Sequence, residues 1–461
     1  MSERIGLGRN ARDRALKVLV ACYDGRRIGS ELLHEWQAIE PLPTLEADLA
    51  AELVMGVARH RITSEHLAAR FYRGRWLSVR PAIRTIFSMA IHQLCWLDRI
   101  PDHAAVDQAV RQAKRHGQAA AATVNAILRQ IVKCRGDVMP LPDEPHPRRW
   151  LPLDVNRGRL FSEDVFPDPA RKPLDYLVAA FGHPPFLVER WHRRFKPKLC
   201  RQVCEAGQQR PPLVLRPNPL RATPTELLAR LAADGVDAQL DEKGRAVILA
   251  ESRGVATLTA FQEGLCQPQD ATSQAALLHA PPRAGEFVLD LCAGRGTKST
   301  QAAELMGNDG VVLATDIDEK KCLLIAENAD RLGVAIIRTA PIDHLQAAIN
   351  SIGRPPDLIL IDAPCTNSGV FARRPEARHR ATFKALTALT QTQGRLLRQA
   401  AALAGPRTRI IYTTCSIERE ENEEQTAQFQ RECAGWMMVS ESLTLPGPGR
   451  GGGYAALLTR E

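Results

Sequence analysis

Hydrophobic residues in the first third of the chain recur three and four positions apart, which is the period of one face of a helix. The period is clearest in two groups, Ala15, Leu16, Leu19 and Val20, and Leu49, Leu53, Val54 and Val57. Further helices are expected over 79–97, 102–116 and 119–132. Pro81 falls in the first turn of its helix, where proline is tolerated. Residues 1–136 are therefore expected to form an all-α domain.

The middle of the chain has two parts. Residues 137–173 contain eight prolines and several charges without a sustained period, and this composition is typical of a semi-extended linker. Residues 174–265 combine stretches with the helical period and short apolar runs typical of strands, so we expect a small α+β domain there. Its expected elements are helices at 174–180, 185–195 and 224–234 and strands at 213–216 and 247–249.

From residue 266 to residue 461 short apolar runs alternate with amphipathic stretches. The expected strands are 287–291, 311–316, 335–338, 357–362, 409–413 and 454–458. The expected helices are 297–306, 319–332, 344–352, 383–404 and 418–433. This alternation predicts an open, mainly parallel, doubly wound α/β sheet. The acidic run 418–424 is interpreted as a solvated cap of the last helix.

Composition narrows the class of protein. No run reaches the roughly 18 apolar residues of a membrane span, and the N-terminus has no secretory apolar core. We expect an intracellular, cytoplasmic protein whose eleven cysteines are reduced. Cys200 and Cys204 have no second ligand pair nearby, so a metal site is not expected. Residues 1–135 hold 21 Lys and Arg against 13 Asp and Glu, and this excess favours a polyanionic partner.

A short glycine loop follows the first strand of the last domain. The run Phe287–Leu291 ends in Ala293-Gly294-Arg295-Gly296, and a helix follows. A strand, a tight loop and a helix let backbone amides approach a nucleotide-like ligand, although many α/β proteins carry such a turn. Asp316 closes the next strand, roughly 20 residues beyond the loop, which is the spacing of a ribose-binding acid.

Two cysteines lie at expected strand ends, where ligands bind in such sheets. Cys365 follows the strand that ends at Asp362, and Cys415 follows the strand 409–413. A helix N-terminus lowers the pKa of a nearby thiol from about 8.5. Two thiols in short polar motifs on neighbouring strand ends therefore indicate chemistry rather than core packing. A disulfide switch is the competing reading, which a reducing cytosol disfavours.

The helical domain resembles the RNA-binding fold of the antitermination factor NusB over nearly its full length. The matching pieces are Ala11–Leu19, Arg80–Arg84, Ile100–Lys114 and Thr123–Arg129. A generic helical bundle is the alternative. The resemblance implies RNA as the polyanionic partner.

Three motifs of the last domain resemble the RNA cytosine-5 methyltransferases that use S-adenosylmethionine. They are Asp290-Leu-Cys-Ala-Gly-Arg-Gly-Thr-Lys298, Asp362-Ala-Pro-Cys365 and Thr414-Cys415-Ser416. With the NusB-like domain, the whole chain is similar to the bacterial 16S rRNA cytosine-5 methyltransferase B (Sun/Fmu) family. The match extends across the middle domain through Pro212–Arg216 and Gln269–Gln274. It implies that residues 174–265 form an RNA-guiding domain and that residues 266–461 form a Rossmann-like catalytic domain.

The resemblance implies roles for individual residues. Cys415 is the nucleophile that adds to C6 of cytosine, Cys365 assists release, Asp362 holds the base and Lys298 supports Asp362. Asp316 binds the cofactor ribose. The implied S-adenosylmethionine site is made of Cys292, Ala293, Gly294, Arg295, Gly296, Thr297, Lys298, Asp316, Asp343 and Asp362. The resemblance implies 16S ribosomal RNA as the substrate. We expect a monomer with no bound metal and no membrane partner.

The chain departs from the family pattern in the loop. The family has Ala-Pro-Gly-Gly-Lys, and this chain has Gly294-Arg295-Gly296-Thr297-Lys298, so Arg295 either pairs with the cofactor carboxylate or crowds the pocket. Asp343 is the nearest substitute for a third-strand acid, because Ala340-Pro341 replaces a Gly-Asp pair. After Cys365 the chain reads Thr366-Asn-Ser-Gly369 in place of Ser-Gly-Thr-Gly.

Two other functions remain as alternatives. An RNA-binding assembly protein with a weakened cofactor pocket is favoured by the altered loop and disfavoured by the retained Cys365 and Cys415. A nicotinamide-dependent dehydrogenase is a poor rival, because the loop lacks the full Gly-x-Gly-x-x-Gly form and hydride chemistry explains neither cysteine.

Overall fold

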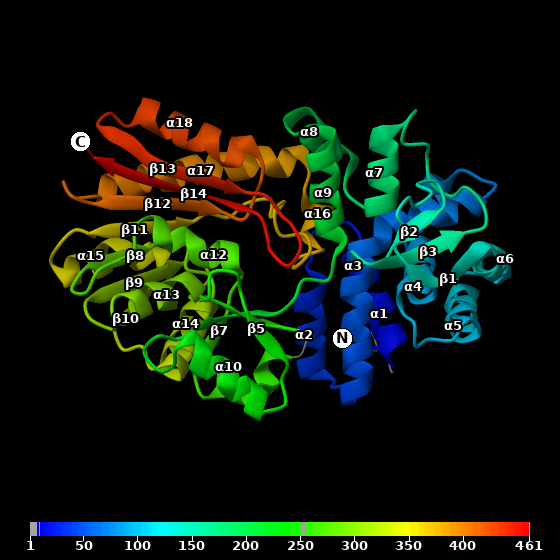
Figure 1. The fold of residues 1–461 in the computed structure, drawn as a ribbon, viewed down its shortest axis with the longest axis horizontal. Helices are drawn as coiled ribbons and strands as arrows, with labels where there is room; N and C mark the ends of the chain where they lie inside the picture. The colour runs from blue at the N-terminus through cyan, green and yellow to red at the C-terminus, as the bar shows by residue number, and fades with distance from the viewer. Residues whose placement is uncertain (1–6, 9, 251–253, 461) are drawn as a thin grey trace, which may run out of the picture. The chain divides into compact units, whose positions relative to one another are not determined.

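The computed structural model describes residues 7–8, 10–250 and 254–460. It divides into two compact units, shown in Figure 1. The first, here called the helical unit, comprises residues 1–210 and 371–382. The second, here called the sheet unit, comprises residues 211–370 and 383–461.

The first part of the helical unit is all-α, as expected. Its helices are α1 (Ala11–Ala21), α2 (Gly29–Ile39), α3 (Thr44–Phe71), α4 (Pro81–Trp96), α5 (Asp102–Lys114) and α6 (Gln118–Cys134), with a 3₁₀ turn η1 (Trp76–Ser78). Pro81 is the first residue of α4. Almost every position of α4 from Ile83 to Cys95 is buried, which places this helix in the centre of the bundle.

The expected linker at 137–173 is wrong, because this segment contains most of a small antiparallel sheet. Strands β1 (Arg135–Pro140), β2 (Trp150–Pro152) and β3 (Arg157–Phe161) pair in the order β1-β3-β2. Two of the prolines end β1 and β2, where a missing amide hydrogen costs no ladder bond. Trp150 and Phe161 are buried and provide the sheet with an apolar core.

The helical unit also contains segments that the sequence assigned elsewhere. Helices α7 (Pro173–Phe181), α8 (Pro185–Arg194) and α9 (Pro197–Gln208) belong to it rather than to the small α+β domain. So does the segment 371–382 with its short helix α16 (Ala377–Arg380), although it lies within the chain of the expected catalytic domain.

Arg378 explains why the segment 371–382 packs in the helical unit. Its side chain is fully buried, and its guanidinium donates to the carbonyl oxygens of Arg59 (2.8 Å), Gly182 (3.0 Å) and Gly207 (2.7 Å). The ring of His379 contacts the carbonyl of Ala58 at 2.7 Å. A buried guanidinium is tolerated only where such acceptors surround it. These hydrogen bonds therefore fix the segment 371–382 in one position within the helical unit.

The sheet unit begins with the expected small α+β domain. Strands β4 (Val214–Pro217), β5 (Ala238–Leu240), β6 (Val247–Leu249) and β7 (Cys266–Pro268) form an antiparallel sheet in the order β5-β6-β4-β7. Helix α10 (Pro224–Ala233) begins at a capping box made by Thr223 and Glu226. A 3₁₀ turn η2 (Val255–Thr257) and helix α11 (Thr259–Gln262) precede β7.

The rest of the sheet unit is the expected doubly wound α/β fold. Its strands are β8 (Phe287–Asp290), β9 (Val311–Asp316), β10 (Ile337–Pro341), β11 (Leu358–Asp362), β12 (Arg409–Thr414), β13 (Trp436–Thr444) and β14 (Gly453–Arg460). They lie in the order β10-β9-β8-β11-β12-β14-β13. The first five are parallel, and β14 and β13 are antiparallel to their neighbours. The edge strand β13 is absent from the sequence prediction.

Helices cover both faces of this sheet (Figure 1). Helices α15 (Leu345–Ile352), α17 (Phe383–Leu403) and α18 (Glu423–Glu432) share one hydrophobic core with the strands. Helices α13 (Thr297–Leu305) and α14 (Glu319–Leu332) and the 3₁₀ turn η3 (Leu277–His279) after α12 (Ala271–Ala276) share the other. Among the described residues, none of the helices has the length and apolarity to cross a membrane, and no metal-binding cluster is found.

Candidate active site

The carboxyl ends of four adjacent parallel strands, β9, β8, β11 and β12, meet at one edge of the large sheet. The glycine loop follows β8, Asp316 ends β9, Asp362 ends β11 and Cys415 follows β12. This is where open α/β sheets bind ligands, so the topology brings the predicted site residues to the same edge. Asp343 lies in the 3₁₀ turn η4 (Ile342–His344) after β10, the strand at the edge of the sheet.

The glycine loop has the shape that its sequence requires. Gly294 and Gly296 both have left-handed backbones, with φ of 59° and 76°, which only glycine adopts without cost. Thr297, which replaces a family glycine, is the first residue of α13 and therefore does not need a positive φ. The substitution consequently does not strain the loop. The side chain of Arg295 is exposed.

Asp316 is held in place by the loop that it faces. Its Oδ2 accepts a hydrogen bond from the backbone N–H of Gly294 at 3.0 Å, and its Oδ1 lies 3.2 Å from Nζ of Lys321. Oδ1 also accepts from the N–H of Asp318. These bonds orient the carboxylate from two sides. They also fix the glycine loop after β8 against the end of β9.

Asp290 is a site residue that the sequence reasoning missed. It begins the glycine-loop motif, and its carboxyl is fully buried. It accepts hydrogen bonds from Oγ of Ser299 (2.7 Å) and from the N–H of Cys292 (3.3 Å). Burial, helped by the charge of Asp362, raises the pKa of Asp290 to about 7. An acid as the last residue of a buried strand was the signal that could have identified it.

Lys298 and Asp362 form an ion pair from different elements, as the sequence analysis expected. Nζ of Lys298, in the first turn of α13, lies 2.6 Å from Oδ2 of Asp362 at the end of β11. The lysine side chain is 8% exposed and the aspartate side chain 38% exposed. The carboxylate therefore has one oxygen committed to the lysine, while the group as a whole is still reachable from solvent.

The two predicted cysteines are in contact. Their Sγ atoms are 3.2 Å apart, too far for a disulfide and close enough for a thiol hydrogen bond. The hydrogen bond with Cys415 and burial raise the pKa of Cys365 well above its ordinary value. Cys365 is buried and Cys415 is partly exposed. The pair therefore consists of one thiol that keeps its proton and one that can reach a ligand.

A buried polar network below the thiols joins their two loops. Glu421 is fully buried and accepts hydrogen bonds from the N–H and hydroxyl of Thr366 (2.9 and 2.5 Å) and from Gln393 (3.1 Å). Ser416, next to Cys415, contacts the hydroxyls of Thr366 and Ser368. Burial raises the pKa of Glu421. These bonds fix the Cys365 loop against the Cys415 loop.

This network corrects the interpretation of the acidic run. Glu418 and Glu421 are not a solvated helix cap, because both are buried, and helix α18 begins only at Glu423. The 3₁₀ turn η5 (Arg419–Glu421) directs Glu421 inward. Charge runs usually indicate surface, and the contact between Glu421 and Thr366, 55 positions apart, could not be read from the local sequence.

The chain is similar over most of its length to known methyltransferases. Residues 276–447 match the family described as 16S rRNA methyltransferase RsmB/F, residues 9–133 match the NusB family, and residues 183–256 match the ferredoxin-like domain of the RsmF/B-like group. The probable ribosomal RNA small subunit methyltransferase B of Bacillus subtilis is 29% identical over 424 residues, which cover 92% of this chain and 88% of the relative.

Two further comparisons agree with this result. The ribosomal RNA small subunit methyltransferase B of Shewanella oneidensis is 30% identical over 387 residues, which cover 83% of this chain and 80% of the relative. The crystal structure of PH0851 aligns with a TM-score of 0.73 at 22% identity, over 97% of this chain and 98% of that chain. The structural likeness extends through both units and shows a shared fold.

Proposed function

Because the chain belongs to the ribosomal RNA small subunit methyltransferase B family, we propose that it methylates C5 of a cytosine in 16S ribosomal RNA. Family membership already makes the chain an S-adenosylmethionine-dependent ribosomal RNA methyltransferase. The proposal concerns the base, the atom and the covalent route. Its main support is the pair of thiols 3.2 Å apart at the same sheet edge as the Lys298–Asp362 ion pair.

The residues around the glycine loop fit the cofactor. Apart from Gly294 and its two chain neighbours, no described residue has an atom within 4 Å of the place where a Cβ of Gly294 would stand, so a ligand can approach the backbone there. The oriented carboxylate of Asp316 suits a pair of ribose hydroxyls. The loop Cys292–Lys298, with Asp316, Asp343 and Asp362, would hold S-adenosylmethionine, which supplies an electrophilic methyl group when bound.

Cys415 is the proposed nucleophile. C5 of cytosine is a weak nucleophile, and addition of the Cys415 thiolate to C6 moves the ring electrons towards C5, which then attacks the methyl group. Loss of the C5 proton and expulsion of the Cys415 thiolate restore the C5–C6 double bond and free the RNA. The target base must leave its stack to reach this edge of the sheet.

Cys365 is suited to the second half of this reaction. Its proton is retained chiefly because of the hydrogen bond with Cys415. Once Cys415 is bonded to C6, that partner carries no thiolate charge, and the pKa of Cys365 falls towards its ordinary value. After the covalent bond has formed, and not before it, Cys365 can give its own proton to water and then accept the C5 proton as the Cys415 thiolate leaves C6.

Asp362 and Lys298 are proposed to bind the base. A carboxylate accepts from the exocyclic amine of cytosine and, when protonated, donates to N3. Lys298 keeps Asp362 oriented through the 2.6 Å contact. The pair would stabilise the charge that develops on the ring during attack at C6.

The proposal is tested by the identity of the product. The protein is incubated with 16S ribosomal RNA and S-adenosylmethionine labelled in its methyl group, and the RNA is then digested to nucleosides. We expect the label in 5-methylcytidine. Label in another nucleoside would contradict the cytosine-5 assignment. RNA binding without methyl transfer and without cofactor binding in a calorimetric titration would favour the assembly-protein alternative.

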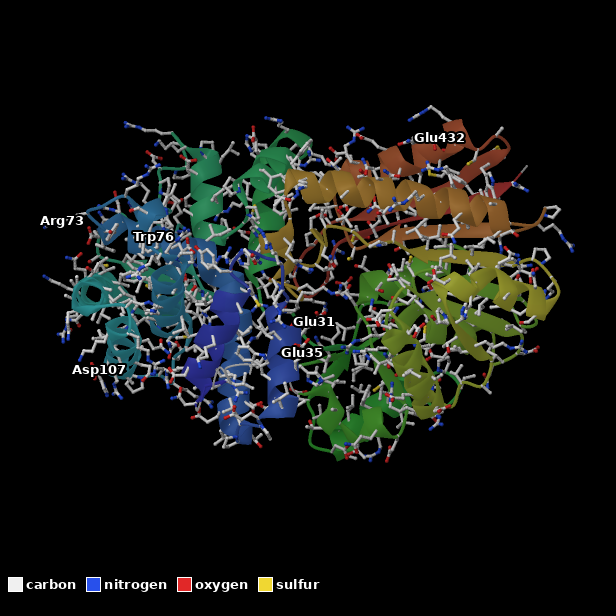
Figure 2. The ribbon with its side chains drawn as sticks, turned by 180° about the vertical axis from the view of Figure 1, so that it is seen from behind. Glu31, Glu35, Arg73, Trp76, Asp107 and Glu432 are labelled. Carbon is white, nitrogen blue, oxygen red and sulfur yellow. The ribbon has the colours of Figure 1, made fainter. Side chains whose placement is uncertain are left out.

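Residues 72–134 of the helical unit carry an excess of exposed cations. Between residues 72 and 134 nine cations are exposed against two exposed carboxylates, Asp98 and Asp107. The exposed cations are Arg73, Arg75, Arg80, Arg99, Arg111, Lys114, Arg115, Arg129 and Lys133. Figure 2 shows Arg73 and Asp107 at the surface of this unit. We propose that these exposed cations bind ribosomal RNA. We also propose that the enzyme is monomeric and cytoplasmic.

Neutralising four of these cations should weaken RNA binding. Replacing Arg111, Lys114, Arg129 and Lys133 by Gln should flatten the salt dependence of the RNA affinity, by about 0.7–0.9 in slope for each lost phosphate contact. The affinity is measured by filter binding at several salt concentrations. Cofactor binding should not change.

The matched control replaces Arg354, Arg395, Arg407 and Arg431, four exposed cations of the sheet unit outside the small α+β domain, by Gln. An equal effect in both sets, or none in the first, would contradict a docking role for the helical unit. Point substitutions are preferable to deletion of residues 1–135, because the deletion would also remove Ala58 and Arg59, whose carbonyls hold His379 and Arg378.

A further inference from the structure

Asn367 is an unusual residue in the Cys365 loop. Its φ is 60°, and among the described residues only Asn308 shares a positive φ without being glycine. A left-handed backbone costs a residue with a Cβ about 1 kcal/mol, less for Asn than for most. The family that the chain resembles has glycine at this position of the motif. The side chain of Asn367 therefore adds contacts that the backbone conformation alone does not require.

Both ends of the Asn367 amide contact the thiol pair. Its Nδ2 donates to the carbonyl oxygen of Cys365 at 2.8 Å, and its Oδ1 accepts from Sγ of Cys415 at 3.1 Å. The carbonyl of Cys365 determines the orientation of the amide, because the reversed amide would place two acceptors against each other. An acceptor-only oxygen consequently faces Cys415.

This arrangement sets the direction of the thiol protons. Because Oδ1 cannot donate, the S–H of Cys415 points to Asn367, and the S–H of Cys365 points to Sγ of Cys415, 3.2 Å away. When Cys415 loses its proton, its sulfur still receives a hydrogen bond from Cys365. If Cys365 lost its proton instead, its thiolate would receive no hydrogen bond from Cys415, because the S–H of Cys415 is directed at Asn367.

We propose that Asn367 is a positioning residue that orients the two thiols: it holds Cys415 as a neutral thiol and leaves the S–H of Cys365 directed at the Cys415 sulfur, where it supports the thiolate once the Cys415 proton has left. The inference rests on the proposed function only in taking Cys415 as the nucleophile. Asn367 itself takes no part in bond making. Its oxygen stabilises the neutral thiol of Cys415, so that the nucleophile stays protonated until the target cytosine binds.

The test is the titration of Cys415 in the free protein. The rate of alkylation by iodoacetamide is measured against pH, without RNA or S-adenosylmethionine, in the wild type, Asn367→Asp and Asn367→Gly. The readout is mass spectrometry of the tryptic peptide 410–419, whose single cysteine is Cys415. The pH midpoint reports ionisation, whereas a change in access alters only the limiting rate at high pH.

The two variants should move the midpoint in opposite directions. Asn367→Asp places a negative charge beside the thiolate and should raise the midpoint by about one unit, which slows alkylation roughly tenfold at neutral pH. The pH profile of kcat for methyl transfer should move upward with it. Asn367→Gly keeps the left-handed backbone, removes the acceptor and should lower the midpoint. Asn308→Gly, the matched control at the other left-handed asparagine, should leave it unchanged.

The outcomes separate this inference from the proposed function. Midpoints that stay in place, or that shift in the same direction in both variants, would overturn the role of Asn367 even if Cys415→Ala is inactive. Opposite shifts support that role, because a merely structural residue would not produce them. A Cys415→Ala protein that still methylates RNA would instead overturn the nucleophile assignment, whatever the titration shows.

Discussion

The Cys415→Ala protein is expected to lose methyl transfer to ribosomal RNA by about 10⁴-fold or more, the scale on which removal of a catalytic nucleophile acts. Without the thiolate, C6 of the cytosine receives no electrons and C5 stays too weak to attack a methyl group. The loss should appear in kcat, since the thiolate acts in the covalent step rather than in the binding of the RNA. Initial rates with saturating RNA and S-adenosylmethionine measure it.

Cys433→Ala is the matched control for this substitution. Cys433 is also a partly exposed cysteine of the sheet unit, and it follows α18 rather than a strand end of the proposed site. It should methylate RNA at the wild-type rate. Equal thermal unfolding of the two variants would exclude a folding defect as the cause. Substantial activity in Cys415→Ala would remove the covalent route from the account.

The second large effect is expected from the Lys298–Asp362 pair. Asp362→Asn should lower kcat about 10²–10³-fold, which is the usual cost of losing one group that stabilises developing charge. Lys298→Met should lower it to a similar extent, because Asp362 then loses the partner that orients it. The double variant should be no worse than about the poorer single one, since residues that act as a unit are not additive.

An ion pair just before the same strand provides the control. Arg354 and Asp357 make a 2.6 Å contact before β11, at the opposite end from Asp362. Arg354→Met should therefore leave kcat unchanged. Additive losses in the Lys298 and Asp362 double variant would show that the two side chains act independently, against the arrangement proposed for the site.

The predictable part of the fold rests on repeated local signals. The helical periods predicted α1 and α3 to α6, and the alternation after residue 266 predicted five parallel strands with their helices. The same strand ends predicted that the glycine loop, Asp316, Asp362 and Cys415 would share one edge. Parallel topology alone was sufficient for that step, because it brings all carboxyl ends to the same side.

The errors occur where local composition misleads. Prolines in 137–173 indicated a linker, although two of them simply end strands β1 and β2. Strand β13 was missed because its outer positions are exposed at the edge of the sheet, and its apolar residues do not form a continuous run. Edge strands carry the weakest sequence signal, since only one neighbour constrains them.

Contacts between distant residues could not be predicted at all. The guanidinium of Arg378 is held by the carbonyl oxygens of Arg59, Gly182 and Gly207, which lie between 171 and 319 positions away in the sequence. Glu421 looked like part of a solvated acidic run, and only the fold brings it to Thr366. Asn367 was visible as a departure from the family pattern, but its contact with Cys415 depends on a left-handed backbone that the sequence did not reveal.

The most direct test of the covalent route is a denaturing gel of the two cysteine variants incubated with 16S ribosomal RNA. If Cys415 attacks C6 and Cys365 serves release, Cys365→Ala should methylate once and stay attached. It should then give a slowly migrating protein–RNA band that requires S-adenosylmethionine, and the double variant should give none. The same band in Cys415→Ala, and its absence in Cys365→Ala, would contradict the account and make Cys365 the nucleophile.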